Sequence, residues 1–213
     1  LDGRSALANG QSQWITGPEA RTDGHRFRAR AQAIITGIGT VLADNPLLTV
    51  RGVEVPIGQL GEPVVLPTPL RVVLDSQLRM PPAAKILNGG CLVATASTDP
   101  TKIQALEAAG AEVLCLTSED GMIDLAEVLT KLAARGVNEV HVEAGPTLSG
   151  ALIKAGLVDE LLMYIAPTLL GSDARGWFDG LHLTNLDQKI ELKIQDVRMV
   201  GADLRIIAFP KYC

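Results

Sequence analysis

The chain has 213 residues, a length that fits a single α/β domain with one contiguous core. Hydrophobic residues make up 47% of it and aromatic residues only 3%, so the interior must be built from Val, Leu, Ile and Ala. The formal net charge of −5 argues against binding to nucleic acids or to membrane surfaces, since both need a basic surface. Small anionic ligands are not excluded, because a few local cations suffice for them.

The N-terminal part begins with a polar, Gly-containing stretch of sixteen residues that is typical of a loop. The sequence Thr16-Gly17-Pro18-Glu19 then predicts a helix start, followed by a helix over residues 17–32. This helix carries Arg21, His25 and Arg28 on one side.

Strands and helices alternate through the rest of the chain. Strands are predicted at 33–36, 71–75, 91–95, 113–116, 139–142 and 160–166, and helices at 100–109, 123–135 and 147–155. Two β-rich runs, 190–199 and 203–209, follow without a helix between them and predict an antiparallel hairpin at a sheet edge. We therefore expect a three-layer αβα fold with a mostly parallel central sheet, in one domain over residues 1–213. The Pro-rich stretch 51–70 is predicted to be a surface excursion.

The cysteines and histidines give no sign of a metal site. Cys91, Cys115 and Cys213 lack CxxC spacing, and the first two lie in apolar runs, so we expect buried free thiols in a reducing compartment. The spacing of His25, His141 and His182 does not suit a metal, which favours structural histidines. Neither a membrane-spanning run nor a signal peptide is present, which predicts a cytoplasmic protein without membrane association.

The segment 140–150 (VHVEAGPTLSG) has the pattern of a phosphate-binding turn. Glu143 stands at the carboxyl end of a predicted strand, and Gly145 precedes a helix N-terminus, where free amides and the helix dipole attract anions. The alternative is an ordinary strand-turn-helix connection capped by Thr147.

Other segments carry polar groups beside predicted strand ends. Thr40, Asp44 and Arg51 follow the first strand, although Asp44-Asn45-Pro46 can equally be only a turn. Ser76 and Arg79 follow the next strand and could accept a 2′-phosphate. Trp14 either stacks on a planar ligand or anchors its loop to the core.

The combined motifs resemble one family over nearly the whole chain. They are LDGR at 1–4, SQWITGPEAR at 12–21, TVLADNPLLTVR at 40–51, VEAGPTLSGALI at 142–153 and VDELLMYIAPTLLGSDAR at 158–175. They resemble the reductase domain of the bifunctional pyrimidine deaminase/reductase of riboflavin biosynthesis, which has a dihydrofolate-reductase-like fold. The resemblance implies an NADPH-dependent oxidoreductase that reduces the ribose of 5-amino-6-(5-phosphoribosylamino)uracil to the ribitylamino product.

The same resemblance assigns site residues. It implies substrate contacts at Ser12, Arg28, Leu48, Arg51 and Glu143, and NADPH contacts at Trp14, Thr40, Asp44, Ser76, Gly145, Pro146, Thr147, Leu148, Ser149, Gly150 and Ala151. Arg28 and Arg51 could then clamp the 5′-phosphate of the substrate. Asp44 and Glu143 are the nominated catalytic residues, as polar or proton-relay groups.

The chain departs from the family pattern at its start. The family's reductase domain opens with a Lys-bearing strand just before LDGR, and it follows a zinc deaminase domain, so we expect this sequence to be part of a longer polypeptide. The positive mean hydropathy and the apolar hairpin predict a homodimer. The alternatives are a reductase of the same fold acting on the diaminopyrimidine form or on folate, and a non-catalytic nucleotide- or phosphosugar-binding domain.

Overall fold

The computed structural model describes residues 1–53, 68–116, 118 and 121–212, which divide into two compact units. The parallel-sheet unit is His25–Ala144, and the hairpin unit combines Leu1–Gly24 with Gly145–Cys213. The boundary falls inside helix α1 (Pro18–Arg30), so both units share that helix. A single domain over residues 1–213 stays a prediction.

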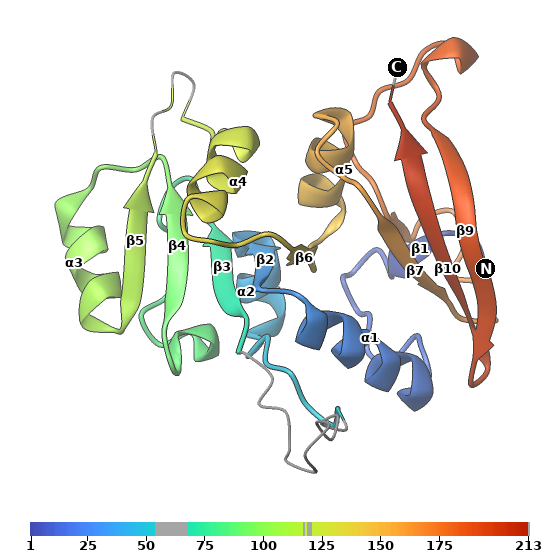
Figure 1. Ribbon diagram of the computed structural model, residues 1–213, viewed down its shortest axis with the longest axis horizontal. Helices are drawn as coiled ribbons and strands as arrows, with labels where there is room; N and C mark the ends of the chain where they lie inside the picture. The colour runs from blue at the N-terminus through green and yellow to red at the C-terminus, as the bar shows by residue number, and fades with distance from the viewer. Residues whose placement is uncertain (54–67, 117, 119–120, 213) are drawn as a thin grey trace. The chain divides into compact units, whose positions relative to one another are not determined.

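The parallel-sheet unit contains five parallel strands (Figure 1). In the order β5-β4-β3-β2-β6 they are β5 (Ala111–Cys115), β4 (Cys91–Thr95), β3 (Leu70–Leu74), β2 (Ala33–Gly37) and β6 (Val140–Val142). The helical elements are α2 (Ile38–Asp44), η1 (Lys85–Leu87), α3 (Pro100–Ala108) and α4 (Leu125–Ala133). The predicted mostly parallel sheet is confirmed, and each predicted strand lies within a few residues of an observed one.

Both faces of this sheet are covered. Ile34, Val73 and Val93 point to one face and form a buried cluster with residues of α2, η1 and α3. Residues of the other parity, such as Val72 and Leu92, are equally buried. Burying each such side chain stabilises the fold by about 1.5–3 kcal/mol. The apolar strand runs therefore explain why both faces of this sheet are buried.

The helices of this unit begin where side chains can cap them. The carboxylates of Asp99 and Asp124 each accept two backbone N–H groups at the starts of α3 and α4. Helix α2 was not predicted, because its seven residues include Gly39 and the β-branched Thr40 and Val41, which are weak helix formers. It ends at Asn45, whose φ of 43° is left-handed and whose side chain accepts the Lys85 N–H at 2.7 Å.

The hairpin unit contains an antiparallel sheet in the order β7-β10-β9. The strands are β7 (Leu161–Ile165), β9 (Glu191–Val200) and β10 (Asp203–Lys211), accompanied by α5 (Pro146–Lys154) and the 3-10 turn η2 (Leu186–Gln188). The predicted hairpin is confirmed. Strand β7, however, pairs antiparallel with β10 and does not join the parallel sheet. The short pair β1 (Arg4–Ala6) and β8 (Arg175–Gly176) was not predicted, because so few residues show no periodicity.

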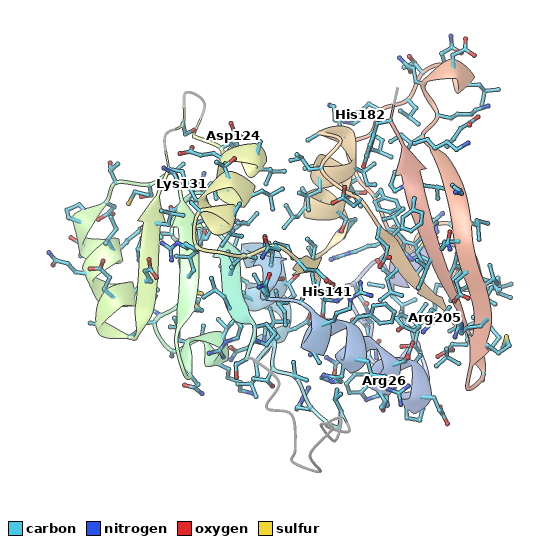
Figure 2. The ribbon with its side chains drawn as sticks, in the orientation of Figure 1. Arg26, Asp124, Lys131, His141, His182 and Arg205 are labelled. Atoms are coloured by element: carbon cyan, nitrogen blue, oxygen red, sulfur yellow. The ribbon has the colours of Figure 1, made fainter. Side chains whose placement is uncertain are left out.

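A buried ion-pair network ties α1 to the antiparallel sheet. Arg205 on β10, which is labelled in Figure 2, donates to Asp23 at 2.8 Å and to Asp196 at 2.9 Å. The Tyr164 hydroxyl donates to the same Asp23 oxygen at 2.8 Å. Burial first, and then the neighbouring Asp23 carboxylate, raise the pKa of Tyr164, so the phenol stays protonated and keeps donating. These contacts fix the N-terminal half of α1 to the sheet.

One face of strand β9 carries exposed apolar side chains. Leu192, Ile194, Val197 and Met199 are 42–62% exposed. They lie opposite Pro210, Ala208, Ile206 and Leu204 of β10, which are buried or half-buried, so the exposed apolar surface is that of β9. Such a face is unusual on a protein surface and indicates an interaction site.

Some predictions concern positions outside the sheets. Cys91 is buried, and burial raises the pKa of its thiol to about 11, but Cys115 is exposed, contrary to prediction, because β5 is an edge strand. Cys213 and most of the stretch 51–70 lie outside the described residues. No helix among the described residues has the length and apolar character needed to cross a membrane. Within the same residues, no cluster of His, Cys, Asp and Glu could hold a metal ion.

Candidate functional site

The centre of the candidate site is a pair formed by Arg28 of α1 and Glu143. The Arg28 Nε and Nη2 groups donate to the two carboxylate oxygens of Glu143, a bidentate arrangement. Glu143 directly follows β6, and its backbone is fixed at the carboxyl end of the sheet because its N–H donates to Ile35 at 2.9 Å. The Thr36 hydroxyl donates to the Glu143 carbonyl at 2.7 Å. Two neighbouring strand ends thus hold this carboxylate in place.

The environment of Glu143 fixes its charge. Burial would raise the pKa of this carboxyl, but hydrogen bonds from Arg28 and His141 outweigh burial and hold the pKa at about 2. His141 on β6, which is labelled in Figure 2, lies two residues before Glu143, and its Nε2 is 3.3 Å from the Glu143 Oε1. A carboxylate with this pKa is ionised at neutral pH and is suited to binding a donor group, not to releasing a proton.

Arg51 lies beside this pair. Arg28 Nη1 donates to the Thr49 carbonyl at 3.0 Å, and the Arg51 N–H donates to His25 Nδ1 at 3.2 Å. The Arg51 side chain is exposed, and within the described residues its guanidinium has no hydrogen-bonded or ionic partner. The charges of Arg28, Arg51 and Glu143 all act on His25. The parallel-sheet unit therefore brings together the two arginines and the carboxylate that the sequence nominated.

The other nominated residues of this unit differ in accessibility. Asp44 is exposed at the end of α2, and Thr40 and Ser76 are half-buried. Leu48 is only 6% exposed and belongs to the core cluster, so its side chain is not available to a ligand. Arg79, considered for a 2′-phosphate, lies 3.8 Å from the buried Asp75 carboxylate.

In the hairpin unit, Trp14 is an exposed ring with one face occupied. Its side chain is 71% exposed, which excludes the alternative that it anchors the loop to the core. The Arg21 guanidinium lies 4.4 Å from the ring centroid and donates to the Thr16 carbonyl at 2.6 Å. This cation–π contact orients the indole for stacking. Ser12, two residues earlier, is half-buried.

The N-terminus of α5 is open on one side. Among the described residues, no side chain caps it at Gly145, so the predicted alternative of a Thr147 cap is wrong, and a Cβ added at Gly145 would meet none of their atoms within 4 Å. Gly150 is different. A Cβ there would come within 1.9 Å of the Asp179 carbonyl oxygen, so packing of the Asp179 backbone requires this glycine. The first backbone N–H groups of the helix lack intrahelical partners and can bind an anion. Pro146 has no backbone N–H to contribute. Leu148, Ser149 and Ala151 also belong to the predicted phosphate-binding turn.

Sequence reasoning missed two residues of the site. His25 was noted only as part of a basic helix side, and His141 was expected to be structural. His141 stands two positions before Glu143, and residues at that spacing point to the same face of a strand, a signal that could have indicated its contact. No comparable signal indicates the contact between His25 and Arg51.

Comparison with known proteins identifies the family. Residues 1–206 match the model described as the RibD C-terminal domain. The chain belongs to the RibD C-terminal domain family. It is 43% identical over 206 residues to the riboflavin biosynthesis protein RibD of Escherichia coli, covering 96% of this chain and 56% of that protein. The chain thus spans about half the length of that curated relative.

Two further RibD-family relatives support the assignment. The 5-amino-6-(5-phosphoribosylamino)uracil reductase of Buchnera aphidicola (Acyrthosiphon pisum) is 31% identical over 209 residues, covering 96% of this chain and 99% of that protein. The structure of Acinetobacter baumannii RibD is 36% identical, with a TM-score of 0.84, covering 99% of this chain and 55% of that one. These neighbours confirm the predicted α/β fold class of dihydrofolate-reductase type.

Proposed function

We propose that this chain reduces the ribose of 5-amino-6-(5-phosphoribosylamino)uracil to the ribitylamino product, with NADPH as the reductant. The observation that carries the proposal is the grouping of Arg28, Arg51 and Glu143 in the parallel-sheet unit. Membership of the RibD C-terminal domain family, and the activity for which its Buchnera relative is named, support the reaction and its place in riboflavin biosynthesis.

Arg28 and Arg51 have different roles in substrate binding. Arg28 commits its Nε and Nη2 edge to Glu143 and donates from Nη1 to Thr49, so only part of its fork remains for a ligand. Arg51 has all its side-chain donors available toward the described residues. We therefore assign the main contact with the 5′-phosphate to Arg51. The ionised Glu143, held in place by Arg28 and His141, would accept hydrogen bonds from the sugar or amine groups of the substrate.

Each unit taken by itself offers groups that suit part of a nicotinamide dinucleotide. In the hairpin unit, the exposed face of Trp14 suits a planar ring, and the uncapped N-terminus of α5 suits a phosphate. In the parallel-sheet unit, Thr40, Asp44 and Ser76 remain the nominated cofactor contacts. The family implies a nicotinamide cofactor, and the choice of NADPH over NADH is part of the proposal.

The chain's residues would align the reactants and supply a proton. A bound nicotinamide would supply the hydride that reaches C1′ of the open-chain imine of the sugar. Arg51 and Glu143 would hold the sugar phosphate so that C1′ is correctly oriented. Because Arg28 and His141 already occupy the Glu143 carboxylate, we assign the proton-relay role to the exposed Asp44.

The test is NADPH oxidation, followed by absorbance, with the phosphorylated aminouracil substrate. Arg51→Ala should raise KM for this substrate at least tenfold (about 1.4 kcal/mol) and leave KM for the dephosphorylated analogue unchanged. Arg135→Ala is the matched control, because within the described residues Arg135 pairs only with the exposed Glu112. Asp44→Asn should fold normally and lose turnover. No oxidation by the wild-type chain would contradict the proposal, and turnover of folate that is indifferent to Arg51→Ala would favour the folate alternative.

We also propose that a second copy covers the apolar face of β9 and that the chain is the C-terminal part of a polypeptide with a zinc deaminase domain. The length of the E. coli relative, of which the chain covers 56%, supports a further domain, and the family resemblance implies that it is a zinc deaminase. For the dimer, sedimentation should show two copies for the wild type and one for Ile194→Asp, because Ile194 is 59% exposed on that face. Lys193→Asp, on the opposite face of β9, is the control. A monomeric wild type at micromolar concentration would contradict the dimer.

A further inference from the structure

Two residues one turn apart on α1 hold the segment that carries Arg51. Arg28 donates to the Thr49 carbonyl at 3.0 Å, and His25 Nδ1 accepts the Arg51 N–H at 3.2 Å. Residues three apart lie on the same side of a helix, so α1 grips this segment at two alternate residues. The backbone of Arg51 is therefore fixed relative to Arg28, although its side chain extends freely.

The contact also determines where His25 carries its proton. Since Nδ1 accepts a hydrogen bond, the neutral imidazole must be protonated on Nε2. Burial, followed by the positive charges of Arg28 and Arg51, lowers the pKa of His25, while Glu143 opposes this effect. The ring is thus neutral at neutral pH, and within the part of the chain that the structure describes its Nε2–H has no acceptor.

The charges around His25 favour a neutral N–H donor over a further cation. Arg28 and Arg51 bring two positive charges and Glu143 brings one negative charge, so the group carries a net single positive charge toward a phosphate dianion. A neutral N–H donor adds a hydrogen bond to the phosphate without further repulsion between cations.

We propose that His25 is a positioning residue of the substrate-phosphate site: its Nδ1 sets the backbone of Arg51, and its Nε2–H is a third phosphate donor beside the two arginines. This inference rests on the proposed function and specifies its ligand as a sugar phosphate monoester. It assigns a role to a residue that the family resemblance left without one.

The kinetic test compares His25→Ala with His25→Asn, on the phosphorylated substrate and on its dephosphorylated analogue. Asn can place an oxygen near the Nδ1 position and accept the Arg51 N–H, but it lacks the Nε2 donor. We expect His25→Ala to raise KM for the phosphorylated substrate about tenfold, with kcat and KM for NADPH within about twofold. His25→Asn should restore part of this loss, and the analogue should show no change with either variant.

His182→Asn is the matched control, because His182 is exposed and has a left-handed φ of 46° that Asn tolerates. An unchanged KM for the phosphorylated substrate in a folded His25→Ala protein would overturn the proposal. An equal rise in KM for the analogue would overturn it as well, because the effect would then not concern the phosphate.

A second measurement separates this proposal from the proposed function. Imidazole ¹⁵N spectra should show His25 as the Nε2–H tautomer, and ribose 5-phosphate should shift its Nε2 resonance but not that of His182. The shift should disappear in Arg51→Ala. If the wild type binds ribose 5-phosphate in this way without oxidising NADPH, only the proposed function fails. If it oxidises NADPH but His25 shows the Nδ1–H tautomer or no shift, only the role of His25 fails.

Discussion

Helix α1 contributes to two arginine–carboxylate pairs, one in each unit, and the two differ in how their remaining donors and acceptors are used. In the hairpin unit, Asp23 accepts hydrogen bonds from Arg205 and Tyr164, and Arg205 also donates to Asp196. In the parallel-sheet unit, Arg28 and Glu143 pair bidentately, yet Arg51 beside them extends an uncommitted guanidinium toward solvent.

The two pairs differ in how far protein encloses them. The side chains of Arg205 and Asp23 are only 10% exposed, so this pair is largely shielded from solvent. Glu143 is 29% exposed and has cationic or donor neighbours on several elements. The same chemical pair is therefore enclosed in one unit and, in our proposal, borders a ligand site in the other.

The largest expected effect comes from breaking the buried pair. Arg205→Met should lower the free energy of unfolding by about 3–5 kcal/mol, because it removes the Arg205 cation from the buried pair with Asp23. Urea unfolding measures this loss. Arg198→Met is the control, since Arg198 contacts the same Asp196 but is exposed, and it should have a much smaller effect. Equal losses in the two variants would contradict the structural role of Arg205.

The Glu143 pair should show its contribution through pH. The pKa of Glu143 falls from the usual 4.5 to about 2, which corresponds to about 3 kcal/mol at about 1.4 kcal/mol per pKa unit. Because the folded pKa is lowered, this stability is fully present above about pH 4.5 and is lost as the pH falls toward 2. The difference in unfolding free energy between wild type and Glu143→Gln should therefore narrow over that window. A difference that stays constant with pH would show that ionisation of Glu143 does not stabilise the fold.

A smaller effect is expected from Arg28→Lys. Lysine keeps the positive charge but cannot make the bidentate contact with Glu143 and reach Thr49 at the same time. We expect a loss of about 1–2 kcal/mol in unfolding free energy. Thermal or urea unfolding of this variant beside Glu143→Gln measures it, and full wild-type stability would argue that the fork geometry is unimportant.

The smallest stability effect should be that of Arg51→Ala. The Arg51 side chain makes no contact that the described residues would lose, and its backbone N–H bond to His25 remains in the variant. Unfolding curves should coincide with those of the wild type, while KM for the phosphorylated substrate rises. A clear loss of stability would mean that Arg51 belongs with the structural pair and not with the binding group.

Much of the fold could be predicted from local patterns. The buried strands are short β-branched runs bounded by turns, and a run such as Arg71–Leu74 shows its strand character without tertiary information. Helix α2 has seven residues, and strands β1 and β8 have three and two. None of these elements was predicted, because such short segments show no clear periodicity. The antiparallel placement of β7 could not be predicted, since hydropathy does not specify which strand becomes its neighbour.

The candidate site was predictable only in part. The family resemblance nominated Arg28, Arg51 and Glu143, and the rule that parallel strands end at one edge explains the position of Glu143 after β6. The contact of His25 with Arg51 depends on the backbone path of residues 46–51, where Leu48 has a φ of 49°. Neither this left-handed turn nor the resulting hydrogen bond follows from side-chain pattern, so that part of the site needed the structure.

The interleaving of the two units along the chain has a consequence for biosynthesis. The parallel-sheet unit is continuous from His25 to Ala144, whereas the hairpin unit joins the two ends of the chain, and its Arg205–Asp23 contact spans 182 residues. Translation therefore completes the parallel sheet, with Arg28, Arg51 and Glu143, before β10 leaves the ribosome. We expect a nascent chain arrested before β9 to contain a protease-resistant parallel sheet. Its first residues should not pack until the C-terminal strands have been synthesised.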